Sequence, residues 1–449
     1  MRSAPLLLAL AISGAALAAQ VPEPRDARIA EAVAKVQAAD LQATVAKLVS
    51  FGTRHTLSKA DDPVRGIGAA RAWLASAFGD LAKAPGSRLK PFEDRFTQPA
   101  GTRMPSPAEL VNVGAILPGT DPRRAKEAIV LTGHYDSRVT DVMNATADAP
   151  GADDDGSGTS MALEAAKALA ATRPAITIYF VAVVGEEQGL FGSAHLAKRL
   201  QDEGVTVLAM LSVDIAGNTR SGDGRRDSLH ARIWSEGSPA TESPAQRRLR
   251  LALGNEQDSP SREWARYLAR VGGRYVDGLE LRVMRRRDRI ARGSDHMSFS
   301  ATGSPAACLR EGIENYDGQH QDVRVEDGRA FGDTLEGFDA PYAAKLCKAV
   351  VAAFAELASA PEPPSDLTLG GAVSPDTKLK WTLPADPRVA GLILYRRAAD
   401  TGNWQRAQRL APSSALTLPG VVPDDSVFAL ATVDTEGHES LPAEVAHLE

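Results

Sequence analysis

The pattern of hydrophobic and polar positions divides the chain into regions of different character. In residues 27–50 and 64–82, apolar residues recur every three or four positions within Ala-rich sequence, which predicts amphipathic helices. From residue 109 onward, short apolar runs alternate with helical stretches, and the runs read ELVNVGAIL, EAIVLTG, AITIYFVAVVG and VLAMLSVDIAG. Apolar runs without alternation are typical of strands covered on both faces, as in a parallel sheet. We therefore expect an α/β domain with three layers, in which helices flank a mostly parallel central sheet.

This α/β pattern extends over most of the chain. A long helical stretch is predicted for Pro244 to Val271, and a final helix for about Ala340 to Ala358. Further strands are expected around Leu279–Met284 and Ala306–Leu309. The stretch between Asn218 and Pro239 has the character of an insertion.

A Pro-rich segment, APEPP at residues 360–364, separates the α/β domain of residues 19–359 from the remainder. Beyond it, residues 365–449 hold strand-like runs such as LKWTL, GLILYRR and SVFALATVD between turn residues. This pattern predicts a small all-β sandwich, which resembles a fibronectin type III module.

The first 18 residues have the features of a secretory signal peptide. Arg2 supplies the positive charge, Leu6–Ile12 form a short apolar core, and Ala16–Ala18 provide small residues for cleavage. This core is too short to span a bilayer, and no other segment is apolar enough, so we expect no membrane span. These features predict that the mature protein is periplasmic or secreted.

The composition narrows the function further. The 449 residues carry a formal net charge of −6, and no basic tract stands out beyond Arg285–Arg287. This charge pattern disfavours a nucleic-acid partner. The two cysteines, Cys308 and Cys347, are too few for a disulfide scaffold, and the sequence leaves open whether they pair.

Polar side chains follow several of the predicted strands at the point where each strand ends. In open α/β sheets, ligands bind at this carboxyl edge. Two histidines, His296 and His320, come later in the chain. The residues that follow the strands are His134 and Asp136 after EAIVLTG, Asp153, Asp154 and Asp155 in the loop GADDDGSG, Glu186 and Glu187 after ITIYFVAVVG, and Asp214 after VLAMLSV.

Carboxylates gathered at one edge would repel one another unless a cation balances them. Because the set mixes His with Asp and Glu and contains no thiolate, zinc is the leading candidate, with manganese and cobalt as alternatives. The number of carboxylates suggests two ions, an arrangement known in hydrolases.

Each motif alone has a plainer interpretation. Three successive Asp residues before Gly-Ser-Gly more often form a helix cap or a calcium loop, and two Glu residues before a helix are favoured by its dipole. The arrival of all of them at consecutive strand ends is much harder to explain by chance.

Taken together, the motifs resemble a known family. The stretches GHYDS, GADDDGSG, VGEEQGLFGS, SVDIAGN and SDHMSF, followed by the late His320, are similar to those of the secreted bacterial zinc aminopeptidases with two metals. This family also includes glutamate carboxypeptidase and glutaminyl cyclase, and the resemblance covers about residues 40–358.

The resemblance implies a role for each site residue. Asp154 would bridge two zinc ions, and Glu186 would be the general base. Asp136 would accept the second N–H of His134, as carboxylates near metal sites often do. The remaining ligands would be His134 and Asp214 on one ion, and Glu187 and His320 on the other.

The implied reaction is hydrolysis of the N-terminal peptide bond of peptide substrates. The two zinc ions would lower the pKa of a bridging water toward about 7. Glu186 would accept the proton of this water and pass it to the leaving amine.

The last ligand position has a rival. His320 is favoured over His296 because it follows the final core strand, PAACLREG, and His296 would then shape the pocket or bind substrate. The sequence departs from the family pattern here, since Gln319 and Gln321 flank His320 where Tyr and Thr are common. Tyr316 is therefore only a candidate for the oxyanion-stabilising tyrosine.

Two other activities stay open. A carboxypeptidase would need a basic residue for the substrate carboxylate, and Arg292 or Arg310 is placed for it. A glutaminyl cyclase-like acyltransferase is disfavoured because His134 and its partner Asp136 are present. The C-terminal module would be an accessory that contacts a polymer or a protein, so deleting residues 365–449 would leave turnover of small substrates largely intact.

Overall fold

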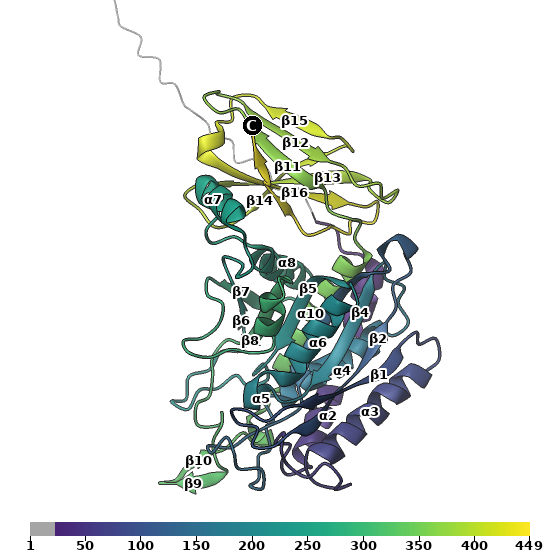
Figure 1. Cartoon of the computed structure of the whole chain (residues 1–449), viewed down its shortest axis with the longest axis vertical. Coiled ribbons are helices and arrows are strands. Elements are labelled where there is room, and N and C mark those ends of the chain that lie inside the picture. Colours follow the sequence, from purple (N-terminus) through teal and green to yellow (C-terminus); the bar gives the residue numbers. More distant parts are fainter. Residues whose placement is uncertain (1–22) are drawn as a thin grey trace, which may run out of the picture.

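A mixed eight-stranded sheet forms the centre of the larger domain in the computed structural model, which describes residues 23–449 (Figure 1). The predicted signal peptide of residues 1–18 lies outside the described residues. Within residues 23–449, no helix combines the length and the hydropathy that crossing a bilayer requires.

The strands of this sheet follow the order β1-β2-β4-β3-β5-β8-β6-β7. The four central strands β4, β3, β5 and β8 are parallel, whereas β2 and β6 run antiparallel to β4 and β8. The predicted α/β class with a mostly parallel sheet between helices is confirmed. The strands are β1 Lys90–Gln98, β2 Ala108–Leu117, β3 Glu127–His134, β4 Thr177–Val183, β5 Thr206–Val213, β6 His230–Ser235, β7 Glu280–Met284 and β8 Ala306–Glu311.

Helices cover both faces of the sheet because the central strands are apolar on both sides. Along β3, Ile129 and Leu131 pack into the larger core, whereas Ala128 and Val130 pack into the smaller one on the opposite face. All four side chains are fully buried, and full burial of a large aliphatic side chain stabilises by about 1.5–3 kcal/mol. The larger core lies under α1 Ala27–Ala34, α2 Ala38–Val49, α3 Ile67–Lys83, α4 Gly156–Leu169, α8 Pro260–Tyr275 and α10 Ala340–Ser359, and the smaller under α6 Phe191–Asp202 and α9 His296–Ala301.

The single helical stretch expected from Pro244 to Val271 is wrong. The structure has two helices there, α7 Pro244–Leu253 and α8. Gly254 ends α7 in the left-handed conformation with φ 67°, which Gly adopts at little cost. Ser259 then caps α8 by accepting a hydrogen bond from the main-chain N–H of Arg262.

Two strands of the sheet were not predicted. The edge strand β1 is largely exposed and polar, so it lacks a continuous apolar run. β6 lies inside the stretch interpreted as an insertion, and it pairs with both β7 and β8. Short runs such as HARIWS carry too little apolar sequence to predict a central strand.

The C-terminal part forms two four-stranded sheets, with orders β15-β12-β11-β18 and β14-β13-β16-β17. Their inner faces share a core that includes Leu379, Trp381 and Phe428. The chain leaves α10 at Ser359 and enters β11 at Ser365. The strands are β11 Ser365–Gly370, β12 Thr377–Thr382, β13 Gly391–Ala398, β14 Gln405–Leu410, β15 Ala415–Leu418, β16 Ser426–Val433, β17 Ala443–Glu444 and β18 His447–Leu448.

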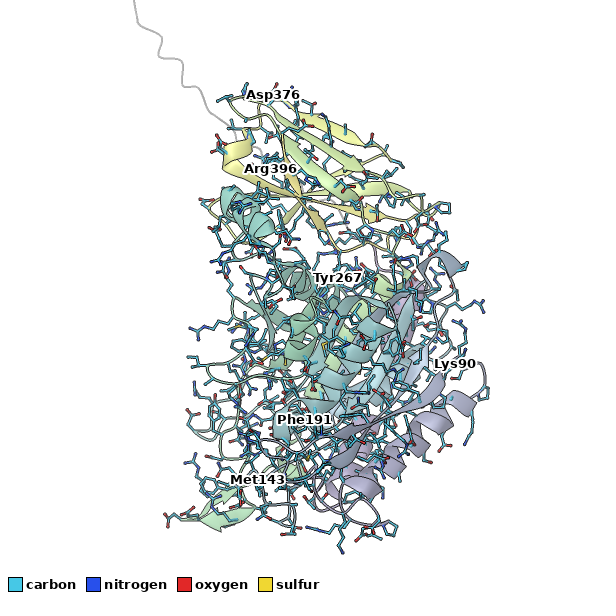
Figure 2. The ribbon with its side chains drawn as sticks, in the orientation of Figure 1. Lys90, Met143, Phe191, Tyr267, Asp376 and Arg396 are labelled. Atoms are coloured by element: carbon cyan, nitrogen blue, oxygen red, sulfur yellow. The ribbon has the colours of Figure 1, made fainter. Side chains whose placement is uncertain are left out.

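Polar side chains join this sandwich to α8. The Tyr267 hydroxyl donates to the main-chain oxygen of Glu439 at 2.9 Å, and Figure 2 places Tyr267 at the junction of the two parts. The Trp404 indole donates to Glu263 at 2.8 Å, and the sandwich therefore sits on charged and aromatic groups of the larger domain. Away from this junction, Cys308 and Cys347 are both buried and free.

Candidate metal centre

The predicted site residues lie at the carboxyl ends of neighbouring strands. His134 is the last residue of β3, and Asp214 directly follows β5. After β4, the short helix α5 Glu186–Gly189 carries the two adjacent glutamates. In Figure 1, α5 lies toward the end of the larger domain that is remote from the sandwich.

Asp154 stands between two histidines. One carboxylate oxygen lies 3.1 Å from Nε2 of His134, and the other lies 2.9 Å from Nε2 of His320. The atoms of the surrounding groups form two sets, each within 4.8 Å. The first set is His134, Glu186 and Asp214, and the second is Asp154, Glu187 and His320.

The ligand atoms of this cluster fit zinc. Of the buried side-chain atoms in residues 23–449 that make no hydrogen bond, three belong to this cluster: Nε2 of His134, an Oε of Glu187 and an Oδ of Asp214. A buried polar atom without a partner is costly, so these atoms indicate a missing ligand. Imidazole nitrogen and carboxylate oxygen are the donors that zinc takes from His, Asp and Glu.

The electrostatics of the cluster show a strongly negative potential. Although burial opposes it, the neighbouring histidines hold the pKa of Asp154 well below its ordinary value. For His320, burial by itself would lower the pKa, but the charges of Glu187 and Asp154 raise it to about 10. The cluster therefore stabilises positive charge at its centre.

Asp136 organises the turn that carries the glutamates. Its carboxylate accepts hydrogen bonds from the main-chain N–H groups of Gly185 at 3.0 Å and Glu187 at 3.2 Å, and from the Thr56 hydroxyl at 2.8 Å. Nδ1 of His134 lies 3.1 Å from the main-chain oxygen of Asp136 and 3.6 Å from its carboxylate. The carboxylate of Asp136 thus holds the turn that carries the glutamates, and the main-chain carbonyl group of Asp136 is the nearer partner of the His134 imidazole.

Glu186 differs from Glu187 in its surroundings. Both glutamates line one cavity, but Glu187 is buried, whereas Glu186 is partly exposed. Burial raises the pKa of the Glu186 carboxyl well above its ordinary value, and the charges of Glu187 and Asp214 add to this. The two adjacent carboxylates therefore belong to different ligand sets and face different environments.

A buried ion pair supports Asp214. The Arg310 guanidinium lies 2.7 Å from an Oδ of Asp214 and 3.5 Å from Asp288, and Arg310 is fully buried. Despite burial, this arginine keeps the pKa of Asp214 below its ordinary value. Arg310 is therefore not placed to bind a substrate carboxylate, whereas Arg292, the other arginine considered for that role, lines the cavity.

The other two predicted residues, His296 and Tyr316, lie apart from the two ligand sets. His296 is buried, and its Nε2 lies 3.0 Å from the main-chain oxygen of Arg287. Its ligand atoms group with those of Asp288 and Cys308 instead. The side chain of Tyr316 is exposed and is not among the residues that line the cavity.

Sequence reasoning missed Asp333 as a site residue. Its carboxylate accepts hydrogen bonds from the main-chain N–H groups of Asp153 at 2.9 Å and Asp154 at 2.7 Å. Burial and the neighbouring charge of Asp153 raise its pKa to about 8. A single Asp in a loop carries no local signal, because its partners are distant in sequence.

Comparisons with known proteins place the chain in a family. Residues 112–336 match Peptidase family M28. A probable zinc metalloprotease of Leptosphaeria maculans is 39% identical over 420 residues, which are 93% of this chain and 96% of that protein. A probable zinc metalloprotease of Pyricularia oryzae is 39% identical over 435 residues, which are 95% and 85% of the two chains.

Solved structures share the fold. The LapA aminopeptidase of Legionella pneumophila superimposes with a TM-score of 0.53 and 21% identity, over 77% of this chain and 79% of that one. LapB of the same organism has a TM-score of 0.53 and 19% identity, over 74% and 75% of the two chains.

The fold and these relatives define the class of zinc-dependent peptidases. The chain belongs to peptidase family M28. The prediction of a zinc peptidase of this type is confirmed at the level of the family. The resemblance pointed to bacterial enzymes, but the curated relatives described above come from fungi.

Proposed function

We propose that the protein is an exported aminopeptidase that uses two zinc ions to hydrolyse the N-terminal peptide bond of peptides. The observation that supports it most is the position of Asp154, with one carboxylate oxygen near His134 and the other near His320. A carboxylate placed in this way is suited to bridge two cations.

The ligands divide between the two ions according to the geometry of the cluster. His134 and Asp214 would hold one ion, Glu187 and His320 the other, and Asp154 both. When bound, zinc supplies Lewis-acid chemistry, since it lowers the pKa of water toward about 7 and polarises a carbonyl group.

Glu186 moves the proton in this proposal. Its carboxylate accepts a proton from the attacking water and donates it to the nitrogen of the leaving amine. Asp136 keeps Glu186 in place through the main-chain N–H groups of the turn. Partial exposure of Glu186 to the cavity gives water and substrate access to it.

A carboxypeptidase is the second candidate, and Arg292, which lines the cavity, favours it. A glutaminyl cyclase-like acyltransferase is less consistent with the site, because His134 is present in the first ligand set. Export rests on the signal features of residues 1–18 alone.

Metal content together with a Glu186 variant tests the proposal. We expect about two zinc ions per chain by mass spectrometry, and turnover of leucine p-nitroanilide but not of its N-acetylated form. Glu186→Gln should keep both ions and lose about 10²–10⁴-fold in kcat, the range for general acid–base catalysis. Glu203→Gln, an exposed position at the end of α6, serves as the control. Equal turnover of the acetylated substrate would exclude an aminopeptidase.

A further inference from the structure

A cavity of about 530 Å³ opens beside the metal centre. This volume is within the range of about 300–1,000 Å³ that is usual for small-ligand sites. Its floor includes Glu186, Glu187, Asp154, Asp214 and His320. Five arginines from three separate loops line the same cavity: Arg103 between β1 and β2, Arg138 after β3, and Arg287, Arg289 and Arg292 between β7 and α9.

Two of these arginines share one acidic partner. Arg289 lies 3.0 Å and Arg292 lies 3.5 Å from the carboxylate of Glu314. Arg232, which is outside the cavity lining, also contacts Glu314 at 2.7 Å. Asp288 contacts Arg289 at 3.1 Å. The acids on this side are therefore divided among several guanidinium groups.

The other three arginines form no ion pair at contact distance within the described part of the chain. Arg103 donates to the main-chain oxygen of Glu187 at 3.0 Å, and Arg138 donates to that of Thr140 at 3.0 Å. Arg287 is exposed and forms no ion pair within 4 Å in residues 23–449, and Glu236 acts on its charge only by a longer-range interaction. Bonds to neutral carbonyl groups do not neutralise a guanidinium, so Arg103 and Arg138 keep their positive charge.

The five arginines that line the cavity are called the arginine wall. Once metals are bound, the carboxylates of the floor no longer neutralise the positive charge of this wall. The four carboxylates of Asp154, Glu186, Glu187 and Asp214 carry the charge that two divalent cations balance. The cavity then presents a positive wall next to the reacting groups. Guanidinium groups bind carboxylates strongly and with defined geometry, often through two parallel hydrogen bonds.

We infer that this arginine wall binds a carboxylate of the substrate close to the scissile bond, so that the enzyme prefers acidic peptides. The inference rests on the proposed peptidase function and adds the substrate class. The carboxylate has two sources, an Asp or Glu side chain or the C-terminal carboxylate of a short peptide. Four apolar residues also line the cavity, Leu190, Ile215, Ala291 and Met297. A preference for an apolar substrate side chain that packs on them is the outcome that would contradict the inference.

Substrate pairs that differ only in the carboxylate separate these cases. In the zinc-loaded full chain, kcat/KM is measured for glutamate against glutamine α-p-nitroanilide, and for Leu-Gly against Leu-Gly-amide. A preference of tenfold or more in the first pair identifies the side chain, and in the second pair the C-terminus. Ratios near one in both pairs would overturn the inference while leaving the peptidase function intact. No turnover of any of the four would instead count against the function itself.

Single variants then test the wall directly. Arg287→Gln and Arg103→Gln should each reduce the preferred pair's ratio at least threefold, mainly through KM. Arg286→Gln is the matched control, because Arg286 is an exposed neighbour that does not line the cavity. Calorimetric titration of the preferred peptide into the Glu186→Gln variant should show binding that weakens as the salt concentration rises. Binding should also be weaker in the double variant that carries both Glu186→Gln and Arg287→Gln. Unchanged ratios and unchanged binding in both arginine variants would contradict the role of the wall.

Discussion

Asp333 accepts a hydrogen bond of 2.7 Å from the main-chain N–H of Asp154, the residue at the centre of the ligand cluster. The two residues are 179 positions apart in the chain. The same carboxylate also accepts from the main-chain N–H of Asp153. The loop that presents the central carboxylate is therefore anchored from the segment that follows His320.

Removal of this anchor should weaken zinc binding. Asp333→Ala leaves two buried N–H groups without partners, each at a cost of about 1–3 kcal/mol. We expect zinc affinity to fall about 10–100-fold, the usual effect of losing a residue that orients metal ligands. Competition with a chromogenic chelator measures it, and Asp322→Ala, an exposed position near His320, is the control. Unchanged affinity would show that the loop holds its shape unaided.

The turn that carries Glu186 and Glu187 should depend on Asp136. In Asp136→Asn, one of the two acceptor oxygens becomes an amide that faces main-chain donors, so the turn loses hydrogen bonds. We expect kcat to fall at least tenfold, with a smaller loss in Thr56→Val, which removes a single donor to the same carboxylate. Steady-state kinetics at matched zinc content measures both. A larger effect from Thr56→Val than from Asp136→Asn would contradict this order.

His438 should make stability depend on pH. Its ring nitrogens each lie 2.8 Å from a carboxylate, one on Asp434 and one on Asp26 at the start of α1, and Glu436 and Arg28 also face this group. Burial would lower the pKa of His438, but the bonds to the two carboxylates raise it. Its contribution is present in full below the unfolded pKa of about 6.5 and is lost as pH rises through the folded pKa.

The carboxylates limit this effect at low pH. The pKa of Asp434 is lowered by its bonds to His438 despite burial, so its contribution is lost as pH falls below about 4. His438→Gln should therefore reduce Tm most between about pH 4 and 6.5 and least in alkaline solution. Thermal unfolding at pH 5.5 and pH 9 measures this, with the exposed His447→Gln as control. An equal loss at both pH values would refute the ion-pair role.

Truncation after residue 364 should lower stability without removing the chemistry. In Figure 1, α5, which carries Glu186 and Glu187, lies toward the end of the larger domain that is remote from the sandwich. However, Tyr267 and Arg270 contact Glu439, and Asp258 pairs with Arg397 at 2.5 Å. Truncation therefore leaves Tyr267, Arg270 and Asp258 without these partners. We expect a Tm lower by several degrees and, at low temperature, a kcat per zinc-loaded molecule within about threefold of the full chain. Loss of kcat in a folded, zinc-loaded truncation would show that the sandwich supports the site.

The sequence predicted much of the sheet because its central strands are apolar on both faces. EAIVLTG, ITIYFVAVV and VLAML became β3, β4 and β5, and the polar residues that follow them meet at one edge. The sequence did not predict β1, β6 or the break before α8. These features depend on pairing and capping between short segments, and the composition of each segment alone does not indicate a strand or a helix end.

By itself, the sequence determined the α/β class and the family and predicted the residues of the proposed metal site, since these follow from local periodicity and from motifs at strand ends. Only the tertiary structure decided that Arg310 pairs with Asp214, that Asp333 anchors Asp154, and that arginines from three loops meet in one cavity. Such contacts join residues far apart in the chain. Their strength depends on distance, orientation and burial, which exist only after the sheet has brought the loops together.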